Sequence, residues 1–125
     1  MNPIQKILNL PLKEYYMKHL AIVSCLLPTH LTVKEIEVLS SFLVLSGELT
    51  KHNLFNPLCR KKVRETLNLS QGGLGNYLKS MTDKKVLMKS EEFGKLEIRP
   101  FLMPDAFKQG YQIMLINESA KPSQS

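Results

Sequence analysis

Three helix-start signals lie in the middle of the chain, and they constrain its fold more than any other sequence feature. Thr32 and Glu35 have the spacing of a capping box, in which a hydroxyl and a carboxylate satisfy backbone amides that have no helical partner. Asn56 before Pro57 is a second start, because asparagine caps helices well and proline is tolerated at the first helical position. Ser70 is a third cap. The predicted helices are Val33–Ser46, Pro57–Leu67 and Gln71–Met81.

Apolar residues recur every three or four positions in these helices, as expected of helices that bury one face. Gly47 follows the first helix at the position where a left-handed C-cap would end it. A short break at Leu69 and Ser70 separates the second helix from the third. The predicted core contains Ile36, Leu39, Leu43, Val63, Leu67, Leu74, Leu78 and Met81.

Residues 1–31 are expected to form an N-terminal helical arm. Pro3, Pro11 and Pro28 argue against one long helix. A shorter helix is expected over Lys13–Cys25, packed on the core that follows, with a dimerisation arm as the alternative. Its apolar stripe consists of Tyr16, Leu20, Val23 and Leu27.

Short β-strands are predicted after the third helix. Val86–Lys89 can form a hairpin with Leu96 and Ile98 through a tip at residues 91–94, or it can pair with a third β-rich segment, Tyr111–Ile116. The sequence leaves both pairings open. The helical and β-rich elements together are expected to form one domain over residues 32–117, followed by a flexible polar tail over residues 118–125.

Basic residues are concentrated in one third of the chain. Residues 51–90 contain nine Lys or Arg and two Asp or Glu, whereas residues 1–50 are neutral and residues 91–125 have a net charge of −1. The whole chain of 125 residues has a formal net charge of +6. Clustered positive charge of this kind is typical of proteins that contact a phosphate backbone, so nucleic acid is the predicted partner.

The sequence indicates neither a membrane protein nor a secreted one. The longest nearly uncharged apolar run, Leu20–Pro28, has nine residues, and a membrane-spanning helix needs roughly 20. The first residues lack the basic start and apolar stretch of a secretory signal. A cytoplasmic protein that does not engage membranes is therefore expected.

No arrangement of residues points to a metal, a cofactor or catalysis. Cys25 and Cys59 lack a CxxC spacing, and His19, His30 and His52 fall in no metal-ligand pattern. Both cysteines are expected to be reduced packing residues. The GlyGlyLeuGly run from position 72 lacks the Walker spacing, so no nucleotide site, small-molecule substrate or enzymatic activity is predicted.

Three stretches of the sequence resemble the winged helix-turn-helix superfamily, in the layout of MarR-type regulators and small phage or plasmid proteins. They are LTVKEIEVL from Leu31, VRETLNLSQGGLGNYLKSM from Val63 and KKVLMKSEEFGKLEI from Lys84. The resemblance implies a mainly α fold with a small β-wing, an α+β class. It also implies that residues 71–80 form the recognition helix, which would enter the major groove.

The resemblance assigns roles to individual residues. Gln71 and Asn76 could contact adenine, and Lys79 could reach guanine or phosphate. Glu91 and Glu92 at the wing tip depart from the basic tips that many winged helices use. The candidate DNA-binding residues are Lys61, Lys62, Arg64, Gln71, Asn76, Lys79, Lys84 and Lys85.

Two functions are compatible with these features. The first is duplex DNA binding in the control of transcription or replication, possibly in a phage. The second is a protein-docking role, as in a phage particle or a polymerase complex, because Gly72, Gly73 and Gly75 weaken the recognition helix and allow close approach.

Overall fold

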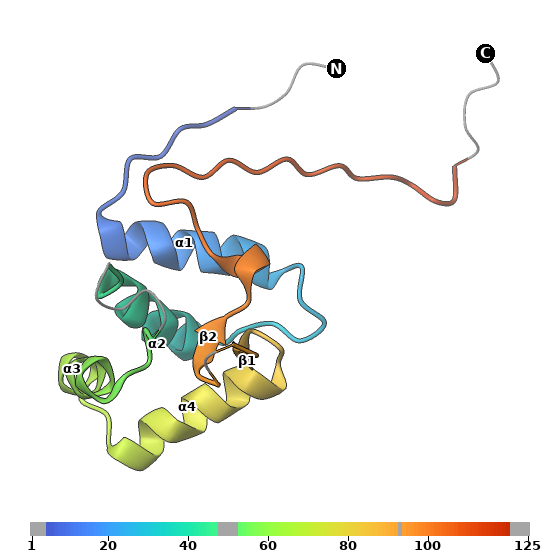
Figure 1. Ribbon diagram of the computed structural model, residues 1–125. Helices are drawn as coiled ribbons and strands as arrows, with labels where there is room; N and C mark the ends of the chain where they lie inside the picture. The colour runs from blue at the N-terminus through green and yellow to red at the C-terminus, as the bar shows by residue number, and fades with distance from the viewer. Residues whose placement is uncertain (1–4, 48–52, 93, 121–125) are drawn as a thin grey trace.

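The computed structural model describes residues 5–47, 53–92 and 94–120, which form four α-helices and a two-stranded antiparallel sheet. The fold is therefore of the mixed α+β class. Figure 1 shows α2 between α1 on one side and α3 and α4 on the other. The elements are α1 (Leu12–Ser24), α2 (Val33–Val44), α3 (Pro57–Leu67), α4 (Gln71–Asp83), β1 (Leu87–Lys89), β2 (Leu96–Ile98) and the 3-10 helix η2 (Pro100–Leu102).

The three helix-start signals operate as the sequence predicts. The Glu35 amide donates to the Thr32 hydroxyl at 3.1 Å, and the Thr32 amide donates to the Glu35 carboxylate at 2.8 Å, which completes the capping box. The side chain of Asn56 caps α3, with Pro57 at its first position, and that of Ser70 caps α4.

The prediction of a left-handed C-cap at Gly47, at the end of α2, is wrong. A left-handed C-cap occurs instead at Asn68, at the end of α3. Helix α2 ends at Val44, and Leu45 continues in the right-handed conformation. Among the described residues, positive φ angles occur at Asn68 (55°), Lys85 (67°) and Gly94 (63°). The short polar side chain of asparagine tolerates this conformation, which allows α3 to turn sharply into α4.

The core lies between α2 and its neighbours, because α2 contacts α1, α3 and α4. Of the eight predicted core residues, six are buried, while Ile36 and Leu67 are only partly buried. The rings of Phe42 of α2 and Phe55 pack in a tilted arrangement, with centroids 4.6 Å apart. Helix α1 belongs to the same core, since its predicted stripe of Tyr16, Leu20, Val23 and Leu27 is buried.

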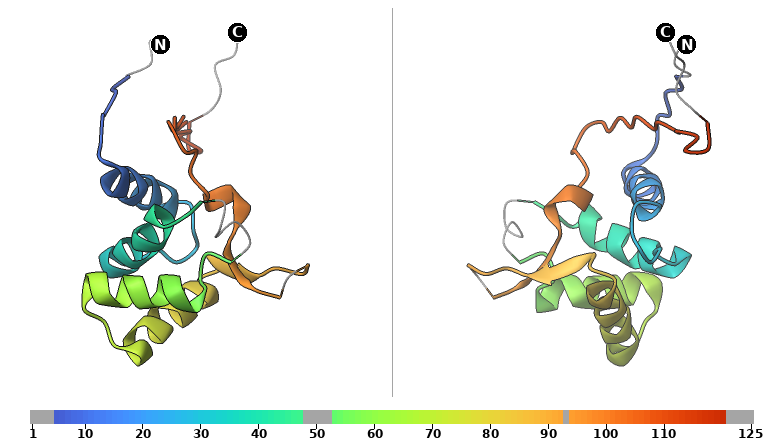
Figure 2. Two further views of the ribbon diagram at one scale, coloured as in Figure 1. Left: turned by 60° about the vertical axis from the view of Figure 1, so that its left-hand side comes forward. Right: turned by 90° about the vertical axis from the view of Figure 1, so that its right-hand side faces the viewer.

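The β-hairpin forms by the local pairing. Leu87 lies opposite Ile98 and Lys89 opposite Leu96, and the hairpin projects from the helices in Figure 2. Residues 111–116 form no strand, so the alternative pairing is wrong for this segment. A short turn with Gly94 in the left-handed conformation joins β1 to β2, and closing this short loop costs less entropy than closing the longer one.

The two cysteines differ in burial. Both thiols are free, and Cys59 is buried as predicted. Cys25 is exposed, so its prediction as a packing residue is wrong. It follows α1 and lies about 200° around the helix axis from the buried Val23, on the side turned away from the core. No helix in the described ranges is long and apolar enough to cross a membrane.

Candidate nucleic-acid interface

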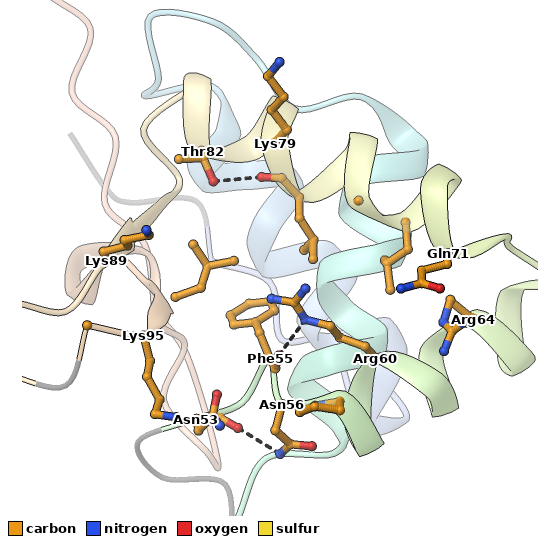
Figure 3. Close-up of a pocket in the computed structure, with 16 residues that line it drawn as sticks. Asn53, Phe55, Asn56, Arg60, Arg64, Gln71, Lys79, Thr82, Lys89 and Lys95 are labelled. Carbon is orange, nitrogen blue, oxygen red and sulfur yellow. Dashed lines mark hydrogen bonds between the residues drawn. The ribbon is translucent and has the colours of Figure 1, made fainter.

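An open groove of about 680 Å³ lies between the start of α3, one face of α4 and the hairpin (Figure 3). None of the described residues that line it is Asp or Glu. Its five cationic residues come from three separate elements, and the groove therefore attracts anions. They are Arg60 and Arg64 of α3, Lys79 of α4, and Lys89 and Lys95 of the hairpin.

Helix α4 presents one regular stripe to this groove. Leu74, Leu78 and Met81 bury the side of α4 that faces the core. The neighbouring face of α4 carries four residues at successive spacings of four, four and three positions, and this spacing places them on one side of a helix. This groove-facing stripe consists of Gln71, Gly75, Lys79 and Thr82.

Helix α3 supplies two arginines one turn apart. Val63 and Cys59 are buried toward the core, which leaves Arg60 and Arg64 on the groove side. The Arg60 Nε donates to the Phe55 carbonyl oxygen at 2.6 Å (Figure 3). This hydrogen bond fixes the base of the guanidinium and leaves its terminal nitrogens to bind an anion.

The hairpin lysines, which the sequence analysis missed, come from the strand pairing. Lys89 shares the strand face of Leu87, whose side chain is buried against the helices. Because Lys89 lies two residues after Leu87, its side chain lines the edge of the groove. Lys95, from the second arm of the hairpin, lines the groove as well. Leu87 and Lys89 are two positions apart, which in a strand places both side chains on the same face. The sequence does not show that this face packs on α4, so the position of Lys89 could not be predicted from it.

The predicted DNA-binding residues separate into two sets. Arg64, Gln71 and Lys79 line the groove. The others, apart from Lys84, are exposed outside it: Lys61, Lys62, Asn76 and Lys85.

Lys84 has an internal contact and is not a free cation. Its ammonium lies 2.5 Å from the Glu35 carboxylate and donates to the His30 carbonyl oxygen at 3.0 Å. Ser80 donates to the other carboxylate oxygen at 2.7 Å. Burial raises the pKa of Glu35, but hydrogen bonds from Lys84, the Thr32 amide and Ser80 outweigh it, and the pKa lies below its ordinary value of 4.5. Lys84 therefore holds the end of α4 to α2.

The glycines of α4 occupy different environments. A Cβ atom added at Gly72 or Gly75 would meet no atom within 4 Å, whereas one at Gly73 would lie 3.0 Å from the capping hydroxyl of Ser70. Gly75 lines the groove, and Gly72 is exposed beside it. Packing within the chain therefore explains the small size of Gly73 alone.

The acidic residues of the hairpin turn, Glu91 and Glu92, are exposed and do not line the groove. The described residues also contain no group of three or more His, Cys, Asp or Glu side chains that could hold a metal ion. No protein-family model matches the sequence, and no curated protein or solved structure is significantly similar to it. Function is therefore inferred from the groove itself.

Proposed function

We propose that this chain is a non-enzymatic winged helix-turn-helix protein that binds duplex DNA through the cationic groove. The observation that carries the proposal is that five cationic residues from α3, α4 and the hairpin line one groove, with no carboxylate among the described lining residues. The order of α2, α3, α4 and the β1–β2 hairpin supports it, since it matches the order of elements in that superfamily.

Each element that lines the cationic groove contacts a different part of the DNA in this proposal. Helix α4 enters the major groove, which is wide enough to admit a helix, and Gln71 meets a base edge there while Lys79 contacts a base or phosphate. Arg60 and Arg64 bind phosphates on one side of α4. Lys89 and Lys95 bind the backbone on the other side, where the hairpin acts as the wing.

Salt-dependent binding to a labelled random duplex tests this function. Each phosphate that a cation neutralises contributes about 0.9 to the slope of log affinity against log salt concentration. Arg64→Ala and Lys89→Ala should each weaken binding and flatten that slope by about one such contact. Lys18→Ala is the matched control, because it removes one exposed positive charge from α1, on the opposite side of α2 from α4 (Figure 1).

Two results would contradict DNA binding through the groove. One is the absence of measurable binding at low salt. The other is an equal loss of affinity in the Lys18→Ala control and in the groove variants, which would indicate a response to net charge alone.

A second candidate function, protein docking on α4, is favoured by the open space beside Gly72 and Gly75. An external surface that approaches closely would explain both glycines. In that case Gly72→Tyr should abolish assembly with a protein partner, while Arg64→Ala should leave assembly intact. The same two variants measured against DNA separate the functions, because Gly72 lies outside the groove and Arg64 lines it.

A further inference from the structure

A second exposed surface lies at the terminal side of the molecule. Four consecutive apolar residues after Tyr111 are largely open to solvent: Ile113 (77%), Met114 (73%), Leu115 (92%) and Ile116 (76%). We call residues 112–116 the C-terminal arm. Contiguous exposed apolar side chains of this kind mark interaction surfaces rather than ordinary protein surface.

The base of the C-terminal arm is fixed to the domain. The buried His19 of α1 is hydrogen-bonded through Nε2 to the Leu102 carbonyl oxygen at 2.7 Å and through Nδ1 to the Tyr111 hydroxyl at 2.5 Å. Since Nε2 must donate to the carbonyl, Nδ1 of the neutral ring accepts from Tyr111. The Tyr15 hydroxyl also donates to the Asp105 carbonyl oxygen at 2.6 Å. The arm therefore leaves the domain from a defined point on α1.

Beyond this point the described chain gives the C-terminal arm no hydrogen-bond partner. None of its residues takes part in a hydrogen bond with another described residue. In an extended segment, alternate side chains point to opposite faces, so Ile113 and Leu115 share one face and Met114 and Ile116 the other. Two apolar faces are typical of a strand that is covered on both sides.

The same side of the molecule carries a second exposed apolar stretch, which we call the receiving surface. Ile7 and Leu8 precede α1, and Leu12 begins it, with exposed fractions of 76%, 52% and 47%. Figure 1 shows this N-terminal stretch and the C-terminal arm on the α1 side of the domain, away from α4. One chain thus presents both an apolar arm and an apolar receiving surface.

We propose that the C-terminal arm docks on a second copy of this chain, where it covers Ile7, Leu8 and Leu12, and that the exchange is mutual about a two-fold axis. Self-complementary surfaces of this kind close into a dimer, because each copy gives and receives the same contact. The proposal does not depend on DNA binding, since α3 and α4, which line the cationic groove, lie on the other side of α2 from α1.

The charge distribution leaves these two segments as the places where a second copy can approach. Two chains that each carry a net charge of +6 repel one another when their basic regions approach. Residues 110–117 contain no charged side chain, and residues 5–12 contain only Lys6. Association through these segments therefore buries apolar surface while the basic residues of α3 and α4 stay apart.

The mass of the full chain, measured by light scattering over a range of concentrations, tests the proposal. The unmodified protein should form a dimer of twice 14.3 kDa. The double variant Ile113→Asp, Leu115→Asp should be a monomer, as should Leu8→Asp on the receiving surface. Val33→Asp is the matched control and should stay dimeric, because Val33 is 78% exposed at the first position of α2, where an acidic residue is tolerated.

Circular dichroism of each variant checks that the fold is retained, and none of the substituted side chains is part of the buried core. A monomeric unmodified protein would overturn the proposal, as would an arm variant that folds and remains a dimer. Open-ended oligomers would also overturn it, because a mutual exchange must close at two copies. A Leu8→Asp variant that folds and remains a dimer would contradict the proposed contact between the C-terminal arm and Leu8.

Discussion

The groove side and the terminal side of this domain differ in the forces that they offer a partner. The groove carries five cations on ordered elements, and the hydrogen bonds of those elements are already made. The C-terminal arm is uncharged and apolar, and its backbone lacks hydrogen-bond partners among the described residues. Binding in the groove should therefore respond to salt, whereas association through the arm should respond to protein concentration and tolerate salt.

A substitution in the hydrophobic core should disturb the groove side and the terminal side together. It has the largest expected effect on the free energy of unfolding. Leu74 is 2% exposed on the buried face of α4. Leu74→Ala should lower the free energy of unfolding by about 2–5 kcal/mol, because it leaves a cavity that the helices fill only partly. Urea unfolding measures the loss. An effect below about 1 kcal/mol would mean that α4 is not packed as described.

The next largest effect concerns the link between α2 and α4. Because the pKa of Glu35 is lower in the folded than in the unfolded chain, its ionised form stabilises the fold above pH 4.5, and this stabilisation is lost as the pH falls through the lowered pKa. Glu35→Gln should cost about 2–3 kcal/mol at neutral pH, since it leaves Lys84 without its counter-charge.

Urea unfolding at several pH values measures both effects of Glu35. The variant should lose less stability than the unmodified protein on acidification. Glu37→Gln is the control, because Glu37 forms only a partly exposed pair with Lys34 at 3.1 Å. Identical acid profiles for the unmodified protein and Glu35→Gln would contradict the role given to this pair.

A sharper test of the groove compares two polar residues of the same helix. Gln71 lines the groove, whereas Asn76 is exposed outside it. Gln71→Ala should reduce discrimination between a preferred and an altered base pair by about 1–3 kcal/mol, and Asn76→Ala should change it less. Competition between duplexes selected from a random pool measures the preference. A larger effect at Asn76 would shift the reading face of α4 away from the groove.

The smallest expected effect is that of Gly75→Ala, which should change the stability of the fold and the affinity for DNA in opposite directions. Glycine in a helix interior costs roughly 0.5–1 kcal/mol relative to alanine, and Gly75→Ala meets no neighbouring atom within 4 Å. Thermal unfolding should therefore show a small gain in stability, while the added methyl group in the groove weakens DNA binding. Gly72→Ala, in the first turn and outside the groove, should change both less.

Local signals in the sequence predicted most of the helical structure. The caps at Thr32, Asn56 and Ser70 involve residues three positions apart, so their geometry depends little on the rest of the chain. The bounds of α3 matched for the same reason. The end of α2 and the choice between two strand pairings needed the folded chain; for the pairing, both partners of Val86–Lys89 had suitable sequences.

The site was less predictable because it depends on contacts between distant residues. Lys84 is 49 positions from Glu35, and nothing in the sequence near Lys84 reveals that its charge is used internally. Arg60, Lys89 and Lys95 were missed because their common location arises only when the hairpin folds against α4. Clustered positive charge in residues 51–90 predicted a nucleic-acid partner, which stays a prediction, and it did not predict which residues line the groove.

The hydrogen bonds of His19 have a consequence for the order of folding. They join this ring to residues 83 and 92 positions later in the chain, so they close longer loops than the contacts of the hairpin or the helix caps. Long loops are costly to close before other contacts have shortened them. During synthesis the helices and hairpin can form first, and Tyr111 can seat on α1 only after the ribosome has released it. A growing chain therefore completes the groove before its C-terminal arm is in position to meet another copy.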